Sequence, residues 1–89
     1  MDAYAKLTAL VELAESVGIT VRHMPPGQAS AEHPGGAMVR LKDKEVLFLD
    51  PGAPAAEQIG LVASALKGRR QIEDRFVPPE LREAIEETR

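Results

Sequence analysis

The chain has 89 residues, which is enough for one domain with a modest hydrophobic core and too few for two. Hydrophobic residues make up 44% of the chain and charged residues 28%, a composition that indicates a folded protein and excludes a disordered one. The net charge of −3 and the low aromatic content of 3% disfavour nucleic-acid binding, and the absence of cysteine excludes disulfides and thiolate metal sites.

Residues 2–17 are expected to form an amphipathic helix. Asp2 is a residue type that caps helix N-termini, apolar side chains then recur at three- and four-residue spacing, and Gly18 accepts the left-handed backbone that ends a helix. The next segment, Ile19–Met24, begins with β-branched residues and alternates in polarity, so it predicts a strand.

The stretch Pro25–Gly35 is the long irregular segment of the chain. Prolines and a glycine begin it and small polar residues follow, which predicts a loop without regular structure. In so small a domain a loop of this length is either functional or merely mobile, and the sequence leaves both alternatives open.

The segment Gly36–Asp50 predicts a β-hairpin with its turn at Asp43-Lys44. Directly opposed residues of a hairpin share one face of the sheet, so this turn predicts a core-facing set of side chains. The set comprises Val39, Leu41, Val46 and Phe48. The second arm is apolar throughout from Val46 to Leu49, as in a central strand buried on both faces.

Two leucines of that second arm, Leu47 and Leu49, then point to the other face and need a cover of their own. The last helix, the tail segment and a second copy of the chain are the three alternatives. The sequence therefore makes Met38, Leu47 and Leu49 candidates for a self-association interface.

The C-terminal half is expected to be mainly helical. Pro54–Lys67 predicts a helix that Gly68 ends, and Gly60 inside it predicts a close approach to a neighbouring element. Gln71–Val77 is expected to be extended, and a short helix follows over Glu80–Thr88.

These elements predict a single α+β domain over residues 1–89. A small, mainly antiparallel three-stranded sheet, made of the first strand and the hairpin, would pack with an N-terminal helix, a post-hairpin helix and a short C-terminal helix.

Two histidines and two glycines are the candidate binding residues. His23 and His33, with Glu32 beside the second, offer zinc-ligand chemistry, but their spacing matches no known ligand pattern, and surface histidines are the alternative. Gly35 and Gly36 would let a peptide or ligand approach the backbone closely, because glycine has no side chain; loop flexibility is the other explanation.

The order of elements carries a resemblance to a known family. A helix, an Ile-x-Val strand, a Pro-Gly loop, Gly-Gly, a hairpin ending in Leu-Phe-Leu-Asp and a further helix resemble, over residues 1–67, the core of bacterial zincin-like peptidases of the ImmA/IrrE type. Those peptidases carry HExxH on the post-hairpin helix, where this chain has the histidine-free run Ala56–Ala65. The resemblance implies a non-catalytic relative without zinc ligands or a catalytic base. The chain is also similar to short uncharacterised bacterial proteins with a Pro-Pro-x-x-Arg pattern.

We expect a small non-enzymatic cytoplasmic protein without a cofactor. It would act through protein–protein interaction or self-association, either as a homodimer or with another protein as its partner. No run of residues is apolar enough to suggest a membrane segment. The alternative is a degenerate zincin-like or small metal-binding or hydrolytic domain that uses His23 and His33. Nucleic-acid binding through Arg69, Arg70 and Arg75 is a third hypothesis, which the acidic residues between them oppose.

Overall fold

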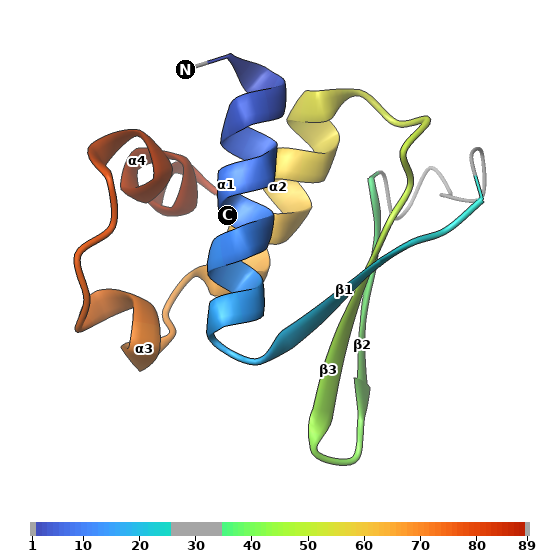
Figure 1. The fold of residues 1–89 in the computed structure, drawn as a ribbon, viewed down its shortest axis with the longest axis horizontal. Helices are drawn as coiled ribbons and strands as arrows, with labels where there is room; N and C mark the ends of the chain where they lie inside the picture. Colours follow the sequence, from blue (N-terminus) through green and yellow to red (C-terminus); the bar gives the residue numbers. More distant parts are fainter. Residues whose placement is uncertain (1, 26–34, 89) are drawn as a thin grey trace.

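The computed structural model describes residues 2–25 and 35–88. In chain order the elements are α1 (Ala3–Ser16), β1 (Ile19–His23), β2 (Gly36–Leu41), β3 (Lys44–Leu49), α2 (Ala55–Leu66), α3 (Arg70–Glu73) and α4 (Pro79–Glu87). Figure 1 shows α1 and α2 side by side on one side of the sheet, and α4 packs against both. The predicted fold class, a small α+β sheet with helices, is confirmed. None of the helices in the described ranges has the length and hydropathy needed to cross a bilayer.

The sheet is mixed and not mainly antiparallel as predicted. Its strand order is β1-β3-β2, with β3 parallel to β1 and antiparallel to β2. The hairpin turn makes β3 antiparallel to β2, whereas the connection from β1 through β2 brings β3 back beside β1 in the same direction. The central place of β3 agrees with its apolar run, because a central strand is the one with both edges paired and the most surface to bury.

The hairpin turn lies at Lys42-Asp43, and the register differs by two residues from the predicted one. Leu41 pairs with Lys44, and Val39 pairs with Val46. A shift of two residues leaves each side chain on its predicted face. The face predicted to be the core is nevertheless the wrong one: Leu47 and Leu49 are fully buried, while the side chain of Leu41 is 58% exposed.

The helices follow the predicted end signals. The Asp2 carboxylate accepts a hydrogen bond from the backbone N–H of Ala5 at 2.8 Å, and Gly18 ends α1 with a φ of 93°. Gly68 ends α2 in the same way, with a φ of 79°. Together α1, α2, α4 and the sheet enclose an aliphatic core. Its members are Leu10, Ala14, Ile19, Leu47, Leu49, Val62, Ala63, Leu66, Ile72, Val77, Leu81 and Ile85.

The segment predicted to be extended contains a helical turn instead. In α3 the backbone N–H of Ile72 donates to the Arg69 carbonyl at 3.0 Å. This turn buries Ile72, and the chain then straightens and buries Val77, so both side chains reach the core. The prediction of an extended segment is wrong because two apolar anchors five residues apart, Ile72 and Val77, fit a turn followed by a bend equally well.

Gly35 and Gly36, predicted as a place of close backbone approach, lie against the chain's own backbone. A Cβ atom on Gly36, whose φ is 138°, would stand 1.8 Å from the carbonyl oxygen of Phe48. A Cβ atom on Gly35 would stand 2.7 Å from the carbonyl oxygen of Glu57. The glycine pair therefore lets β2 begin directly against β3 and the first turn of α2. At Gly60 the predicted neighbour approaches the carbonyl side only: the Thr88 hydroxyl, just after α4, donates to the Gly60 carbonyl oxygen at 3.3 Å, whereas a Cβ atom would meet nothing within 4 Å.

These contrasting surroundings give opposite expectations for two alanine substitutions. Gly36→Ala should lower the free energy of unfolding by about 3 kcal/mol or more, because a backbone atom of β3 must move and the φ is unfavourable for alanine. Gly60→Ala should raise it by about 0.5–1 kcal/mol, because alanine is the better helix former and has room. Urea unfolding of both variants checks this, and equal effects in the two would contradict the packing of the glycine pair.

Candidate interaction surface

The sheet has a second face that no helix or strand of the described residues covers. Side chains of a strand point alternately to the two faces of the sheet. In each strand every second residue points to the helices, and the remaining residues share the second face. We call it the open face. It comprises Thr20, Arg22, Ala37, Val39, Leu41, Lys44, Val46 and Phe48.

The middle of the open face is apolar. Leu41 is exposed and the others are half-buried. We call these residues the apolar stripe: Ala37, Val39, Leu41, Val46 and Phe48. A sheet face that meets water normally carries polar side chains in alternation with the buried ones. An apolar side that no described helix covers is thus the unusual feature of this sheet, and it makes the open face the leading candidate for a functional surface.

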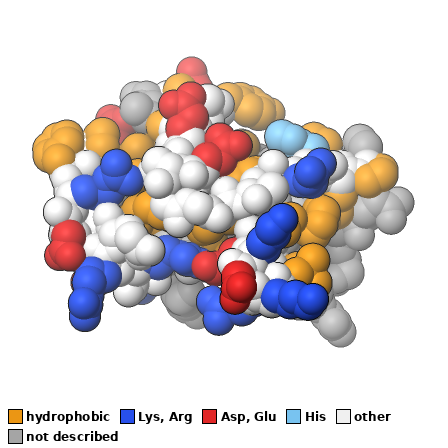
Figure 2. All heavy atoms as spheres, turned by 60° about the horizontal axis from the view of Figure 1, so that its bottom comes forward, with side chains coloured by type: hydrophobic (Ala, Val, Ile, Leu, Met, Phe, Trp, Pro, Cys, Tyr) orange, Lys and Arg blue, Asp and Glu red, His pale blue; other side chains and the backbone are white. Residues whose placement is uncertain are grey.

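Basic side chains border the apolar stripe. Arg22 and Lys44 lie on the open face itself, Lys42 lies in the adjacent turn, and all three are exposed. We call these three residues the basic rim. Figure 2, in which the hairpin end is turned forward, shows Lys and Arg side chains gathered at the surface there with hydrophobic side chains beside them. Asp43, which is also exposed, lies between Lys42 and Lys44 in the turn.

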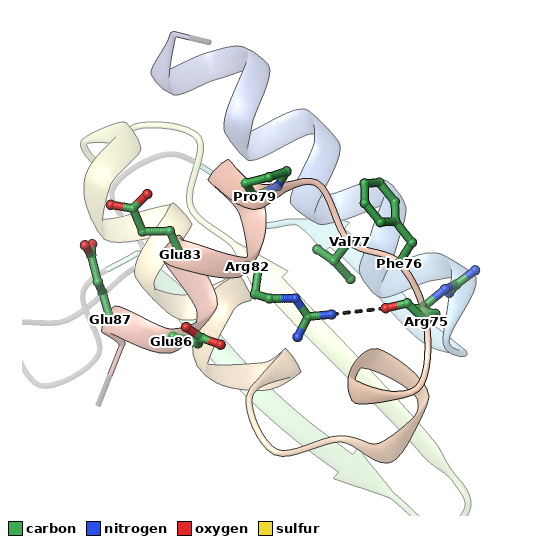
Figure 3. A pocket seen from close by; sticks show the side chains of 8 residues that line it. All are labelled: Arg75, Phe76, Val77, Pro79, Arg82, Glu83, Glu86 and Glu87. Atoms are coloured by element: carbon green, nitrogen blue, oxygen red, sulfur yellow. Dashed lines mark hydrogen bonds between the residues drawn. The ribbon is translucent and has the colours of Figure 1, made fainter.

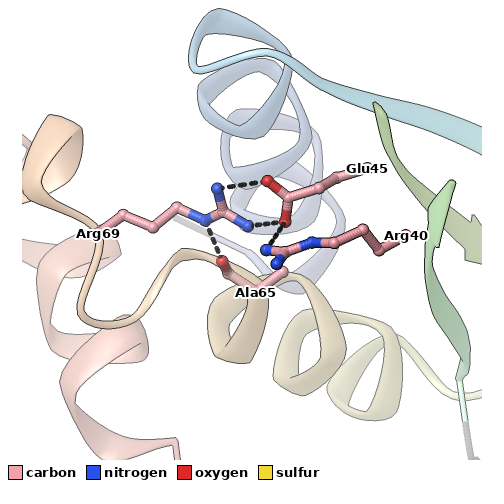
Figure 4. Close-up of polar contacts among 4 residues, drawn as sticks. All are labelled: Arg40, Glu45, Ala65 and Arg69. Carbon is pink, nitrogen blue, oxygen red and sulfur yellow. Dashed lines mark hydrogen bonds and ion pairs between the residues drawn. The ribbon is translucent and has the colours of Figure 1, made fainter. Parts of the chain in front are cut away.

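An ion-pair cluster on the helix side of the sheet holds the hairpin against the rest of the molecule (Figure 4). The guanidinium of Arg69, just after α2, makes two hydrogen bonds to the Glu45 carboxylate, one of them from Nη1 at 2.9 Å. Its Nε also donates to the carbonyl oxygen of Ala65. Arg40, opposite Glu45 in the hairpin, adds a contact of 3.5 Å. The paired geometry fixes the start of β3 to the end of α2.

Two groups of this cluster have clearly shifted pKa values. The hydrogen bond from Arg69 lowers the pKa of Glu45 against the opposing effect of burial, and the same bond raises the pKa of Arg69. Both groups favour their charged forms because each neutralises the other. The two charged side chains therefore stabilise the fold by pairing with each other.

A hollow of about 620 Å³ lies between the end of α3 and α4 (Figure 3). Arg82 at its wall donates to the carbonyl oxygens of Ile72 at 3.3 Å and Arg75 at 3.0 Å. Phe76 on its border is 83% exposed, and the remaining charged side chains are of both signs. A single exposed aromatic among mixed charges is common on monomeric proteins, so this hollow is a weaker candidate than the open face.

The predicted metal ligands are not brought together by anything the structure describes. His23 lies exposed at the end of β1, and His33 lies outside the described residues. No group of three or more potential ligand side chains exists within residues 2–25 and 35–88. Metal binding through His23 and His33 therefore stays a prediction.

The predicted interface residues lie inside the chain's own core. Leu47 and Leu49 are fully buried, and Met38 is half-buried against the same cluster. The prediction that they await an external partner is wrong, because α1 and α2 supply the cover. The apolar face left over is the opposite one.

The predicted basic cluster is also divided among different contacts. Arg69 binds Glu45, while Arg75 donates from Nη1 to the Ser16 hydroxyl at 2.9 Å. Arg70 is exposed between them. These three side chains do not form one phosphate-binding surface, and the hypothesis of nucleic-acid binding through them loses its structural basis.

Comparison of the chain with protein-family models, with curated proteins and with solved structures finds no match. The resemblance to zincin-like peptidases is therefore left as a prediction.

The sequence did contain the signal for the open face. The alternation of the hairpin places Val39, Val46 and Phe48 on one face of the sheet, but it does not say on which face the helices lie. The Glu45–Arg69 pair had no such signal, because 24 residues separate the two and a salt bridge across that separation depends on the fold.

The lowered pKa of Glu45 predicts a pH-dependent contribution to stability. The contribution is present above the ordinary pKa of 4.5, where both the folded and the unfolded chain carry the charge, and it is lost as the pH falls through the lower pKa of the folded state. Glu45→Gln should therefore lower the free energy of unfolding by about 1 kcal/mol at neutral pH, and the difference from wild type should shrink in acid. Glu12→Gln, at an exposed site on α1, is the matched control. Denaturant titrations at several pH values measure both, and a pH-independent difference would contradict the assignment.

Proposed function

We propose that the protein is a non-enzymatic protein-binding domain that docks a segment of another protein on the open face of its sheet. The observation that carries the proposal is the apolar stripe, which lies outside the core cluster on a face that no described helix covers, with Leu41 exposed and its other members half-buried. Covering such a stripe contributes roughly 25 cal/mol for each Å² of apolar surface removed from water. The free energy gained on binding would come mainly from this burial.

The size of the surface favours a short segment over a globular partner. Three paired strands of about six residues span roughly 10 Å by 17 Å. A stable protein–protein interface buries about 800 Å² on each partner, which is several times this area. A single helix or strand from another protein matches the open face better than a second folded domain does.

Self-association is the competing use of the same surface. The open face of each copy carries Arg22 and Lys44 and no carboxylate, so two copies joined through their open faces would bring only positive charges to the contact. Like charges in a desolvated contact oppose association. We therefore place a different protein on the open face, and homodimerisation becomes an outcome that the experiment distinguishes.

The test uses Val39→Thr with Val46→Thr, which keeps the β-branched shape and removes apolar surface. Tyr4→Ser with Phe76→Ser, at exposed positions on other elements, is the control. Proteins captured from the source cell by wild type are purified and titrated against all three forms, with chemical shifts mapped by NMR. Loss of two methyl contacts should weaken binding about tenfold in the first variant and leave the control unchanged.

Chemical-shift changes confined to the open face would support the proposal. Equal weakening by the control, or perturbations centred on the hollow beside Phe76, would overturn it. Sedimentation velocity tests the remaining alternative, a homodimer. If the purified chain is a dimer and the Val39→Thr and Val46→Thr changes dissociate it, the partner on the open face is a second copy of the chain and not a segment of another protein.

A further inference from the structure

The open face has a charge as well as a shape, and the two together specify its partner. We infer that the docked segment is an acidic amphipathic helix of about three turns. This inference rests on the proposed function and adds the conformation and the charge of the partner to it.

The dimensions of the open face match one helix. An α-helix with its side chains is about 10–12 Å wide, close to the roughly 10 Å that three strands span. At 1.5 Å of rise per residue, the strand length of roughly 17 Å corresponds to about 11 helical residues. Such a helix would cover the apolar stripe as α1 and α2 cover the opposite face, and the domain would become a sheet between two helical layers.

The basic rim selects the sign of the helix charge. Among the described residues, Arg22, Lys42 and Lys44 have no salt-bridge partner, whereas Arg40 and Arg69 are occupied by Glu45. The Glu45 carboxylate therefore offers the rim no neutralisation, since it points to the helix side of the sheet. Carboxylates flanking the apolar residues of a docked helix would meet the free cations at the border, where rim charges set specificity and association rate.

The chain's own acidic helix does not satisfy these requirements. The exposed side chains of α4 include Glu80, Glu83 and Glu87, so its charge is suitable. Its apolar side chains, Leu81 and Ile85, are buried in the chain's own core. A second copy therefore cannot present α4 as an amphipathic helix without unfolding its own core, and the partner is a different protein.

The experiment uses two synthetic helical peptides with the same leucines at i, i+3, i+4 and i+7. One peptide carries glutamate at the flanking positions and the other carries lysine. The purified full chain is titrated with each by fluorescence anisotropy, at low salt and at physiological salt, and NMR maps the site. We expect the glutamate peptide to bind at least about tenfold more tightly, with shifts on the open face and weaker binding as salt screens the rim.

Charge reversal of the rim provides the matched test. Arg22→Glu with Lys44→Glu should reverse the preference of the chain between the two peptides, while Arg70→Glu, at an exposed site on α3, should leave it unchanged. Circular dichroism checks that each variant is folded.

Two results would overturn the inference. Equal affinity of both peptides for the open face would contradict the inference that the partner is acidic, but it would not contradict the proposed function. Binding of neither peptide, or binding away from the open face, would remove the helical partner, and the proposed function would then be judged by its own capture and titration experiment.

Discussion

The structure depends on which side of strand β3 is buried. Adjacent side chains of a strand point to opposite faces, so placing Leu47 and Leu49 beneath α1 and α2 forces Val46 and Phe48 to the other side. Because β3 is central, its neighbours follow the same alternation, and all of the open face is fixed by this one choice. The Gly36 backbone contact and the Glu45 ion pair then hold the two ends of the hairpin in that arrangement.

The helices that the structure describes cover one side of the sheet only. In the described ranges, α1 and α2 cover the sheet on the side of Leu47, and α4 packs against these two helices on their far side (Figure 1). An apolar strand pattern on the opposite side has no role in that core. The same region of the molecule gathers unpaired basic side chains, whereas α4 is acidic on its outer surface. A hydrophobic surface with a charged border is the usual composition of a binding site, and this combination is the basis of the proposed function.

Much of the fold could be predicted from the sequence because its signals are local. The Asp2 cap, Gly18 and Gly68 define two helices, and the apolar run of β3 indicated a central strand. The buried side of the sheet could not be predicted, because Val46–Leu49 is apolar on both faces and only the position of the helices distinguishes them. The same limit explains why Leu47 and Leu49 were assigned to an interface. Long-range polar contacts such as Glu45 with Arg69 lie beyond any periodicity argument.

Thiol labelling tests the central claim most directly, because the chain contains no cysteine of its own. Val46→Cys and Leu47→Cys place a thiol at neighbouring positions of one strand, on opposite faces of the sheet. In the native protein the Val46→Cys thiol should react readily with an aromatic disulfide reagent, and the Leu47→Cys thiol should react only after denaturant is added. Rapid labelling at Leu47 with protection at Val46 would contradict the account, since it would exchange the core and the open face.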